Sequence, residues 1–299
     1  MMHDSNLRSV TPCSRRGFLQ WTGLAAAGVS GAVASGVRAT AAPEPAAQPG
    51  GRRLPLTLGI ATYTFRKFNL DKTLAMTKRA GLTHVCLKSF HLPLEAKPDE
   101  IAAAAEKVRA AGLVLYGGGV ISMQREAQVA QAFDYAKAAG MKLIVAAPGA
   151  EMLPLIDRKI KEYDIAVAIH NHGPGDKHFP TPESAYEKIK RCDKRFGLCI
   201  DVGHTVRIGA DLLESTEKYA DRLLDVHMKD VTEAAPKGRE IQAGRGIIDI
   251  PKFLRTLVHV KFVGVVSFEY EPEADDPLPG LAESVGYTRG AMAALPLQG

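Results

Sequence analysis

The sequence predicts a single (β/α)8 barrel, and three observations lead to that prediction. Short apolar runs alternate with longer helical patterns from residue 55 onward. There are eight such runs, which is the number of strands in a closed parallel barrel of this type. Residues 42–299, which remain after an N-terminal leader, come close to the roughly 250 residues typical of the architecture.

The predicted strands are almost continuously apolar, as expected when helices cover the outer face of a parallel sheet. They are residues 56–64, 83–88, 113–119, 142–148, 165–170, 196–203, 222–228 and 264–271. Helical patterns such as "PDEIAAAAEKVRAAG" separate them, with Pro98 and Pro182 in first-turn positions and glycine at several ends. A doubly wound open sheet is the alternative, but "ATYTFRKF" after the first strand lacks the glycine-rich phosphate loop of that fold.

The composition is that of an ordinary globular protein, with 46% hydrophobic, 24% charged and 6% aromatic residues. The net charge of +5 is mild and not gathered into a basic, aromatic-interleaved face, which argues against nucleic-acid binding. After the leader the chain has three cysteines, Cys86, Cys192 and Cys199, at no metal-ligand spacing. We expect Cys86 and Cys199 to be small buried hydrophobes inside strands.

The first residues form a leader outside the fold. A twin arginine, Arg15–Arg16, precedes a weakly apolar Ala/Gly-rich run and the small-x-small pattern at residues 39–41. This segment resembles a twin-arginine export signal, which implies the Tat export machinery as a partner and a periplasmic or exported mature protein with no membrane association. A membrane-anchoring helix is the alternative, disfavoured by the short, glycine-rich run. The expected organisation is a signal peptide at 1–41, a linker at 42–54 and the barrel at 55–299.

Imidazole, carboxylate and ammonium groups gather at the carboxyl ends of the predicted strands, where the active sites of such barrels lie. Side chains alternate along a strand, so polar residues two positions apart at one end share a face. The residues are Lys88 on the second strand; His170 and His172 on the fifth; Asp201 and His204 at the sixth; Asp225, His227 and Lys229 on the seventh; Glu269 and Glu271 on the eighth.

Four of these residues, His170, Asp201, His227 and Glu269, are predicted to bind one divalent metal ion. The shell contains nitrogen and oxygen but no thiolate, which suits Mn²⁺ first, with Zn²⁺, Co²⁺ and Fe²⁺ as alternatives. Four protein ligands can leave positions open for substrate oxygens. The alternative is that each is only a polar strand end, and His170 could stand beside the metal rather than on it.

The motifs "LCIDVGHT", "LLDVHMKD" and "VVSFEYE" resemble the xylose isomerase-like TIM barrels, a group that includes ketose 3-epimerases, inosose dehydratase and, more distantly, endonuclease IV. The resemblance runs from "LGIATYTF" to "AESVGYTRG". It implies Asp201, His227 and Glu269 as metal ligands and His204 as a group for substrate or a second metal.

The fifth strand departs from the family pattern. Many relatives have Glu-Asn-His where this chain has His170-Asn171-His172. The resemblance implies that epimerases of the group use two metal-bound glutamates, one on each face of the substrate. Only Glu269 remains here, so we expect elimination next to the carbonyl of an oxidised sugar rather than simple 3-epimerisation.

The remaining predicted site residues serve catalysis or substrate binding. Long βα loops often carry such groups, and residues 238–250 have the glycines and charges of a lid. The predicted catalytic groups are His172, His204, Lys229 and Glu269, and the predicted substrate contacts are Lys88, His204, Glu240, Arg245 and Glu271. The alternative for both lysines is a solvated position at the rim. Phe65, Phe90 and Phe179 are candidates for stacking on a sugar ring.

Together these features predict an exported, metal-dependent carbohydrate enzyme that works through an enolate. It would act as a sugar isomerase or epimerase, or as a lyase or hydratase on a keto-sugar or keto-glycoside, and homo-oligomerisation stays open. Two alternatives belong to other classes: an endonuclease IV-like phosphodiesterase, which would need several metals, and a non-catalytic periplasmic sugar-binding barrel. Binding alone needs no metal triad, and fold by itself does not decide function.

Overall fold

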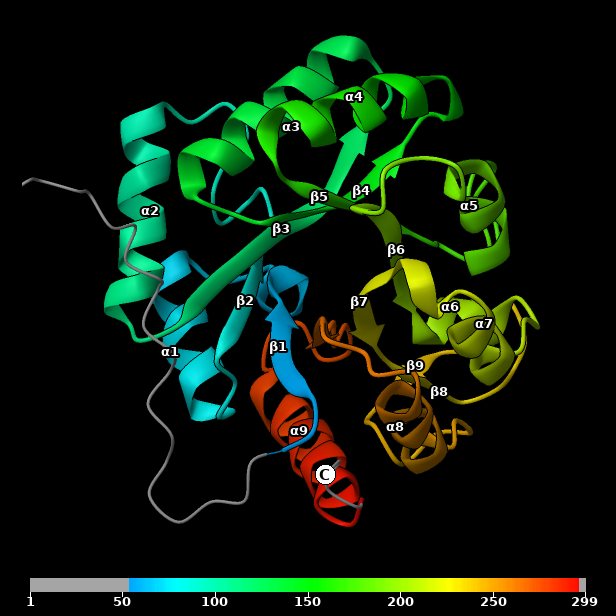
Figure 1. Cartoon of the computed structure of the whole chain (residues 1–299). Coiled ribbons are helices and arrows are strands. Elements are labelled where there is room, and N and C mark those ends of the chain that lie inside the picture. The colour runs from blue at the N-terminus through cyan, green and yellow to red at the C-terminus, as the bar shows by residue number, and fades with distance from the viewer. Residues whose placement is uncertain (1–53, 296–299) are drawn as a thin grey trace, which may run out of the picture. The chain divides into compact units, whose positions relative to one another are not determined.

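Eight parallel strands close into a barrel in the computed structural model, which describes residues 54–295 (Figure 1). Around the barrel the order is β1-β10-β7-β6-β5-β4-β3-β2. The strands are β1 (Thr57–Ala61), β2 (His84–Leu87), β3 (Val114–Met123), β4 (Leu143–Pro148), β5 (Ala166–His170), β6 (Phe196–Asp201), β7 (Leu223–Met228) and β10 (Val265–Phe268). The predicted (β/α)8 barrel is therefore confirmed.

Helices alternate with the strands and lie around the outside of the barrel (Figure 1). They are α1 (Leu70–Arg79), α2 (Pro98–Ala110), α3 (Glu126–Ala139), α4 (Leu153–Tyr163), α5 (Pro182–Ile189), α6 (Val202–Arg207), α7 (Leu212–Lys218), α8 (Ile250–His259) and α9 (Leu278–Ala293). Short 3₁₀ turns lie at η1 (Thr62–Phe65), η2 (Ala150–Met152) and η3 (Ala220–Arg222). Pro98 and Pro182 begin their helices as predicted, and Gly140 ends α3 with a φ of 70°, a conformation that favours glycine.

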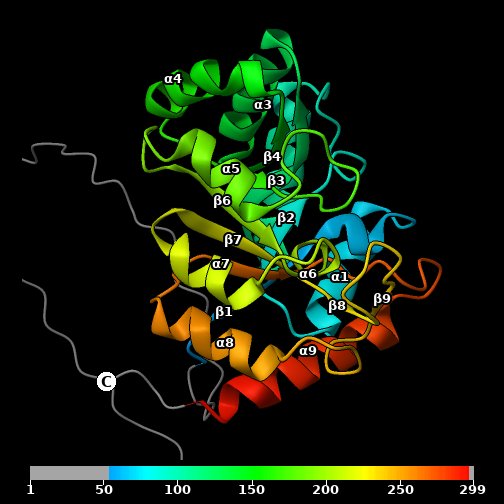
Figure 2. The same cartoon turned by 90° about the vertical axis from the view of Figure 1, so that its right-hand side faces the viewer.

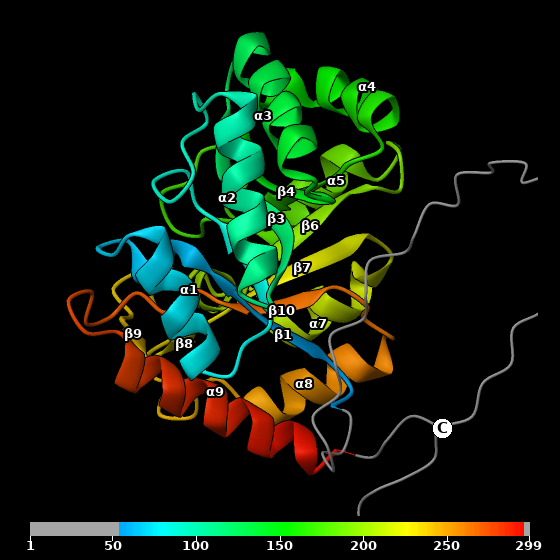
Figure 3. The ribbon, with the colours of Figure 1, turned by 90° about the vertical axis from the view of Figure 1, so that its left-hand side faces the viewer.

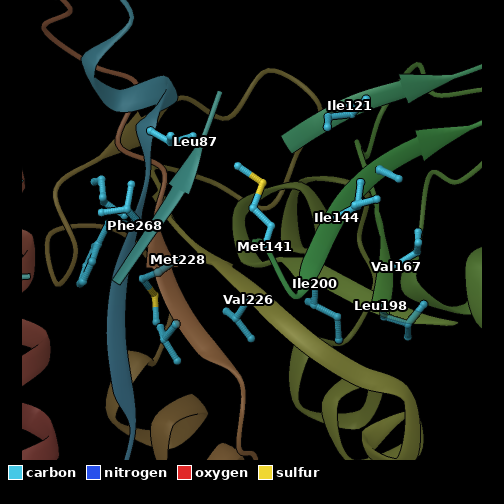
Figure 4. Packing of buried hydrophobic residues seen from close by; sticks show 14 of the residues in the cluster. Leu87, Ile121, Met141, Ile144, Val167, Leu198, Ile200, Val226, Met228 and Phe268 are labelled. Carbon is cyan, nitrogen blue, oxygen red and sulfur yellow. The ribbon is translucent and has the colours of Figure 1, made fainter. Parts of the chain in front are cut away.

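Outward-facing strand residues form the main hydrophobic core with the helices. Val167, Ile200 and Val226 are fully buried members of it, and Figure 4 shows such side chains along neighbouring strands. Burying each aliphatic side chain of this size is worth about 1.5–3 kcal/mol. A second, smaller cluster of inward-facing residues, which includes Val145 and Ala168, fills the inside of the barrel.

Cys86 and Cys199 belong to that inner cluster, and both are buried free thiols as predicted. Burial raises the pKa of both thiols well above the usual range. They therefore pack as small apolar groups.

A two-stranded hairpin follows β7 before the chain returns to the barrel through α8. Its strands, β8 (Asp230–Val231) and β9 (Glu240–Ile241), are antiparallel. The hairpin packs against α6, and Figure 2 shows the two side by side. The predicted lid, residues 238–250, thus begins in the loop of this hairpin and includes β9. Helices α8 and α9 also lie side by side (Figure 3).

Arg222 ties the amino ends of β6 and β7 together. Its side chain is buried, and its guanidinium donates hydrogen bonds to four backbone carbonyls, those of Lys190, Cys192, Asp193 and Phe196. A guanidinium has five donors in a rigid fork, so one residue can satisfy several carbonyls that a turn leaves unpaired. The end of the barrel opposite the predicted site is held in this way.

Several predicted boundaries differ from the structure. The first strand ends at Ala61 because the chain turns into η1, and the third continues past Gly119 to Met123. The eighth barrel strand ends at Phe268, so Glu269 lies just beyond it. The predicted signal peptide and most of the linker lie outside the described residues. Within residues 54–295, no helix has the length and apolarity needed to cross a membrane.

Candidate metal centre

The structure brings the four predicted metal ligands together at the carboxyl end of the barrel. His170 is the last residue of β5 and Asp201 the last of β6; His227 lies opposite Asp201 in the β6–β7 register. Glu269 follows β10, the next strand around the barrel. One ligand atom from each of the four residues lies within 4.8 Å of the others, and all four residues are buried.

The donor atoms of this cluster match a divalent metal ion. His170 Nε2 lies 3.4 Å from Asp201 Oδ2, and His227 Nδ1 lies 3.2 Å from Glu269 Oε2. In the described part of the chain, both ring nitrogens of His170, Asp201 Oδ2 and His227 Nε2 are buried without a hydrogen-bond partner. Buried polar atoms nearly always have a hydrogen-bond partner, so this group of unpaired atoms needs an explanation. A metal held by two imidazoles and two carboxylates would satisfy one ring nitrogen of His170 and Asp201 Oδ2, while His227 Nε2 faces Asp225.

Lys229 lies inside the cluster and not at a solvated rim, so the rim alternative for this lysine is wrong. Its ammonium lies 3.0 Å from Glu269 Oε2 and 3.4 Å from Asp201 Oδ2. It also pairs closely with Glu271 and lies 3.9 Å from Glu240 Oε2. Only 5% of the residue is exposed, and the four carboxylates stabilise its buried charge.

Charge and burial shift the pKa values of this centre in opposite directions. Burial alone would lower the pKa of Lys229, but the carboxylates of Asp201 and Glu269 raise it well above its usual range. Burial would raise the pKa of these two acids, yet the charge of Lys229 holds both below their usual range. Burial lowers the pKa of His170 to about 3. His170 is therefore a neutral imidazole, the form that can bind a metal.

Asn171, between the two histidines of "HNH", holds neighbouring strand ends in place. Its amide oxygen accepts a hydrogen bond from the backbone N–H of Asp201 at 3.0 Å, and its amide nitrogen donates to Thr205 Oγ1 at 3.1 Å. Asp201 Oδ1 in turn caps α6 by accepting from the backbone N–H of His204 at 2.7 Å. Oδ1 of Asp201 is thus used for structure while Oδ2 faces the cluster.

Asp225 is a buried acid beneath the centre that the sequence prediction noted but left out of the site. Its Oδ2 lies 3.7 Å from His227 Nε2, and it accepts hydrogen bonds from Tyr116 and Cys199. Burial raises its pKa to about 7. A carboxylate behind a metal-binding histidine orients the ring, and the two-residue spacing from His227 is the signal that could have identified it.

His172 and His204 lie beside the centre, as predicted. The ring centroids of His170 and His172 are 4.5 Å apart, and those of His172 and His204 are 6.1 Å apart. The side chain of His172 is 38% exposed, and its Nδ1 lies 3.3 Å from Asp176 Oδ2. This contact favours a proton on Nδ1, which leaves Nε2 with a free lone pair.

A cavity of about 400 Å³ adjoins the centre. Four predicted residues line it, His204, Lys229, Glu240 and Glu271, together with two arginines that the sequence prediction missed, Arg207 and Arg239. Burial raises the pKa of Glu240 well above its usual range, with Lys229 acting against the shift.

The two arginines were missed because they do not end strands. Arg207 lies on α6, one turn after His204, and Arg239 lies in the hairpin loop. The three-residue spacing between His204 and Arg207 on a helix was the available signal.

Lys88 directly follows β2, which lies across the barrel from β6. Its ammonium donates to the backbone carbonyl of Val120 at 3.3 Å and lies 5.4 Å from the ring centroid of Tyr63. Burial lowers its pKa, with the charge of Glu269 acting against the shift. Lys88 is thus a partly buried lysine that, within residues 54–295, has no carboxylate within ion-pair distance.

Arg245 is the predicted substrate contact that the structure does not bring to the site. Its guanidinium forms two hydrogen bonds, of 2.5 and 2.8 Å, with Glu283 on α9. The side chain is 59% exposed and does not line the cavity. Loop length and charge suggested a lid arginine, but a carboxylate on the neighbouring helix satisfies it instead.

Among the three candidate stacking residues, only Phe90 is accessible. Phe65 and Phe179 are buried in the hydrophobic core, while Phe90 is 45% exposed. The ring centroids of Phe90 and Tyr63 are 6.1 Å apart, so Phe90 would offer its exposed ring to a sugar as part of this aromatic pair.

Comparison with known proteins agrees with this architecture. The family model described as "Xylose isomerase-like TIM barrel" matches residues 61–291. The rhizopine catabolism protein MocC of Rhizobium meliloti is 27% identical over 147 residues, which cover 44% of each chain. The match therefore spans less than half of that relative's own length.

Two solved structures of low sequence identity share the fold. The IOLI protein with a bound zinc atom superposes with a TM-score of 0.68 at 18% identity, covering 80% of this chain and 98% of its own. The 3-keto-D-glucoside 4-epimerase YcjR of E. coli superposes with a TM-score of 0.64 at 16% identity, covering 79% of this chain and 99% of its own.

Proposed function

This chain belongs to the xylose isomerase-like TIM barrel family, and from that premise we propose that it is a divalent-metal-dependent carbohydrate enzyme. Its substrate would be a keto-sugar or keto-glycoside, and its reaction would pass through an enolate. The observation that supports this proposal most is the buried cluster of His170, Asp201, His227 and Glu269 beside an open cavity. Pockets with convergent polar groups of perturbed pKa are the usual location of chemistry.

These four residues would hold the metal, which we expect to be Mn²⁺, with Zn²⁺, Co²⁺ or Fe²⁺ as alternatives. When bound, such an ion polarises a carbonyl and so favours loss of a proton from the adjacent carbon. Lys229 and Lys88 would add positive charge near the oxygen on which negative charge develops. The zinc atom bound to the structurally similar IOLI protein supports metal binding in this fold.

His172 is the proposed base. Its contact with Asp176 orients the ring, and its partial exposure gives a substrate access to the free Nε2. This nitrogen would take the proton from the carbon beside the carbonyl, and the electron pair of the broken C–H bond would form the enolate. In an elimination, the enolate returns that pair to expel a leaving group from the next carbon.

The proposed reaction is elimination or hydration rather than 3-epimerisation of a free ketose. Epimerisation requires a proton donor on the opposite face of the substrate, and the fifth strand supplies His170 where an epimerase of this group has a glutamate. The similarity to a 3-keto-D-glucoside 4-epimerase supports oxidised glycosides as a substrate class to test first.

The test compares the wild type with His170→Glu and His172→Ala on a 3-keto-glycoside and on fructose and tagatose. We expect wild-type cleavage of the keto-glycoside, a gain of ketose epimerisation in His170→Glu, and loss of turnover at nearly full metal content in His172→Ala. A base acts in the transition state while a ligand holds the ion, so the two roles separate in this way. Efficient wild-type ketose epimerisation without keto-glycoside cleavage would refute the elimination proposal.

The phosphodiesterase alternative fits the site less well. In the described part of the chain, two groups of residues could hold a metal ion, and both contain His170 and His227. They outline one centre and not the several that an endonuclease IV-like reaction needs. The sugar-binding alternative predicts tight sugar binding without turnover, which the same assays would reveal.

Export through the twin-arginine pathway is a separate proposal, supported by the leader sequence at Arg15–Arg16. Sequencing of periplasmic protein should begin at residue 42 or 43, and replacing both arginines by lysine should leave precursor inside the cell. Mature protein found mostly in the cytosol despite an intact leader would contradict it.

A further inference from the structure

The cavity beside the metal centre carries two arginines for which the proposed reaction has no use. Arg207 and Arg239 line it together with Lys229, Glu240 and Glu271. Proton removal and carbonyl polarisation are covered by other groups, so the two guanidinium groups need a separate explanation. The argument rests on the proposed function, because it concerns the substrate of the same site.

The guanidinium of Arg207 has one donor with a hydrogen-bond partner and one buried donor without. Its Nη2 donates to the backbone carbonyl of Pro236 at 2.7 Å, which fixes the side chain against the hairpin loop. Its Nε is buried and has no hydrogen-bond partner among residues 54–295. Leaving a buried donor of a charged group unpaired is costly, and a ligand oxygen would remove that cost.

Arg239 approaches the same cavity from a different element. Its backbone N–H donates to Thr232 Oγ1 at 3.1 Å, while its side chain is exposed. Within residues 54–295, neither Arg207 nor Arg239 has a carboxylate within ion-pair distance, although Glu240 and Glu271 line the same cavity. Those two carboxylates are instead directed to Lys229.

The charges of the site favour an anionic ligand once a divalent ion is bound. Asp201, Glu269 and Glu271 contribute three negative charges, and Lys229 with a divalent ion contributes three positive ones; Glu240 is left out because burial raises the pKa of its carboxyl well above the usual range. The two arginines raise this balance from about 0 to about +2. A guanidinium can also bind two oxygens of a carboxylate or a phosphate at once, which a lysine ammonium does less well.

We propose that Arg207 and Arg239 form a subsite for an acidic group, a carboxylate or a phosphate, carried by the sugar substrate. The acidic group would lie between α6 and the hairpin loop, and the reacting carbons would lie towards the metal centre. Neutral sugars would occupy the same cavity without filling the subsite.

The test measures binding and not turnover. Titration calorimetry of the metal-loaded wild type with D-glucuronate, D-glucose 6-phosphate and D-glucose compares a carboxylate, a phosphate and a neutral probe. We expect one of the acidic probes to bind at least tenfold more tightly than glucose, and the better of the two identifies the acidic group. Arg207→Gln and Arg239→Gln should each remove most of that preference while metal content and glucose binding stay within about twofold of the wild type.

Two further variants separate the subsite from general charge effects. Arg255→Gln removes the same charge from an exposed position on α8 and should keep the preference. Arg207→Lys keeps the charge but not the forked guanidinium, so this variant should keep only part of the preference for the acidic probe. Equal affinity for all three probes in the wild type, or a preference that survives both arginine-to-glutamine changes, would overturn the proposal. A preserved preference in a protein without keto-sugar turnover would instead count against the proposed reaction.

Discussion

The two halves of the barrel are built from the same parallel strands but differ in what those strands carry at their ends. Strands β1 to β4 end in Ala61, Leu87, Met123 and Pro148, and among the residues directly after them only Lys88 ionises. The ends of β5, β6, β7 and β10 supply two imidazoles and two carboxylates within 4.8 Å. Because strand geometry is shared, the chemistry depends on a few terminal side chains and not on the fold itself.

The largest expected effect is loss of metal from the second half. His227→Ala should remove most bound metal and activity while circular dichroism stays native, because a four-ligand site is severely weakened by loss of one ligand. The matched control is His84→Ala, which changes a half-buried histidine at the start of β2. Elemental analysis measures the metal content of both variants. Full metal occupancy in His227→Ala would rule out His227 as a ligand.

The next effect concerns the first half, which apart from Lys88 we expect to serve stability. Ile144 in β4 is fully buried in the main core, so Ile144→Ala should lower the free energy of unfolding by about 2–5 kcal/mol. Metal content per folded chain should not change. Val263→Ala, at a position 95% exposed, is the control with almost no expected effect. Loss of metal from folded Ile144→Ala would show that the two halves are not separable.

A smaller effect should come from beneath the centre. Asp225→Asn keeps the size of the side chain but removes the carboxylate that orients His227, so metal affinity should fall about 10–100-fold. Competition with a chelator measures this affinity. Ser267→Ala is the control, because the Ser267 hydroxyl contacts Tyr116 instead of His227. Unchanged metal affinity in Asp225→Asn would show that Asp225 does not contribute to metal binding beyond the four predicted ligands.

The smallest effect is expected for Arg245→Gln. Its partner Glu283 is solvent-exposed, so loss of this ion pair should cost no more than about 1 kcal/mol and leave KM unchanged. Steady-state kinetics on whichever sugar is turned over would measure KM. A several-fold increase in KM would return Arg245 to the substrate site and contradict its assignment as the ion-pair partner of Glu283 on α9.

The fold was predictable because eight apolar runs separated by helical patterns leave few other architectures. The grouping of the candidate site residues was predictable for a related reason: alternation along a strand decides that His227 and Lys229 point the same way. The burial of Lys229 was not predictable, because it depends on four carboxylates from other elements. A single sequence cannot show which loop residue meets which helix, and for that reason Arg245 was included and Arg207 was missed.

The buried Arg222 has a consequence for how this chain could change over evolutionary time. Its four carbonyl contacts lie at the amino ends of β6 and β7, away from the cluster at their carboxyl ends. Substitutions that alter what the cavity accepts therefore need not disturb the way these two strands are joined at their base. Descendants of this sequence could exchange one substrate for another by few mutations, with little accompanying loss of foldability.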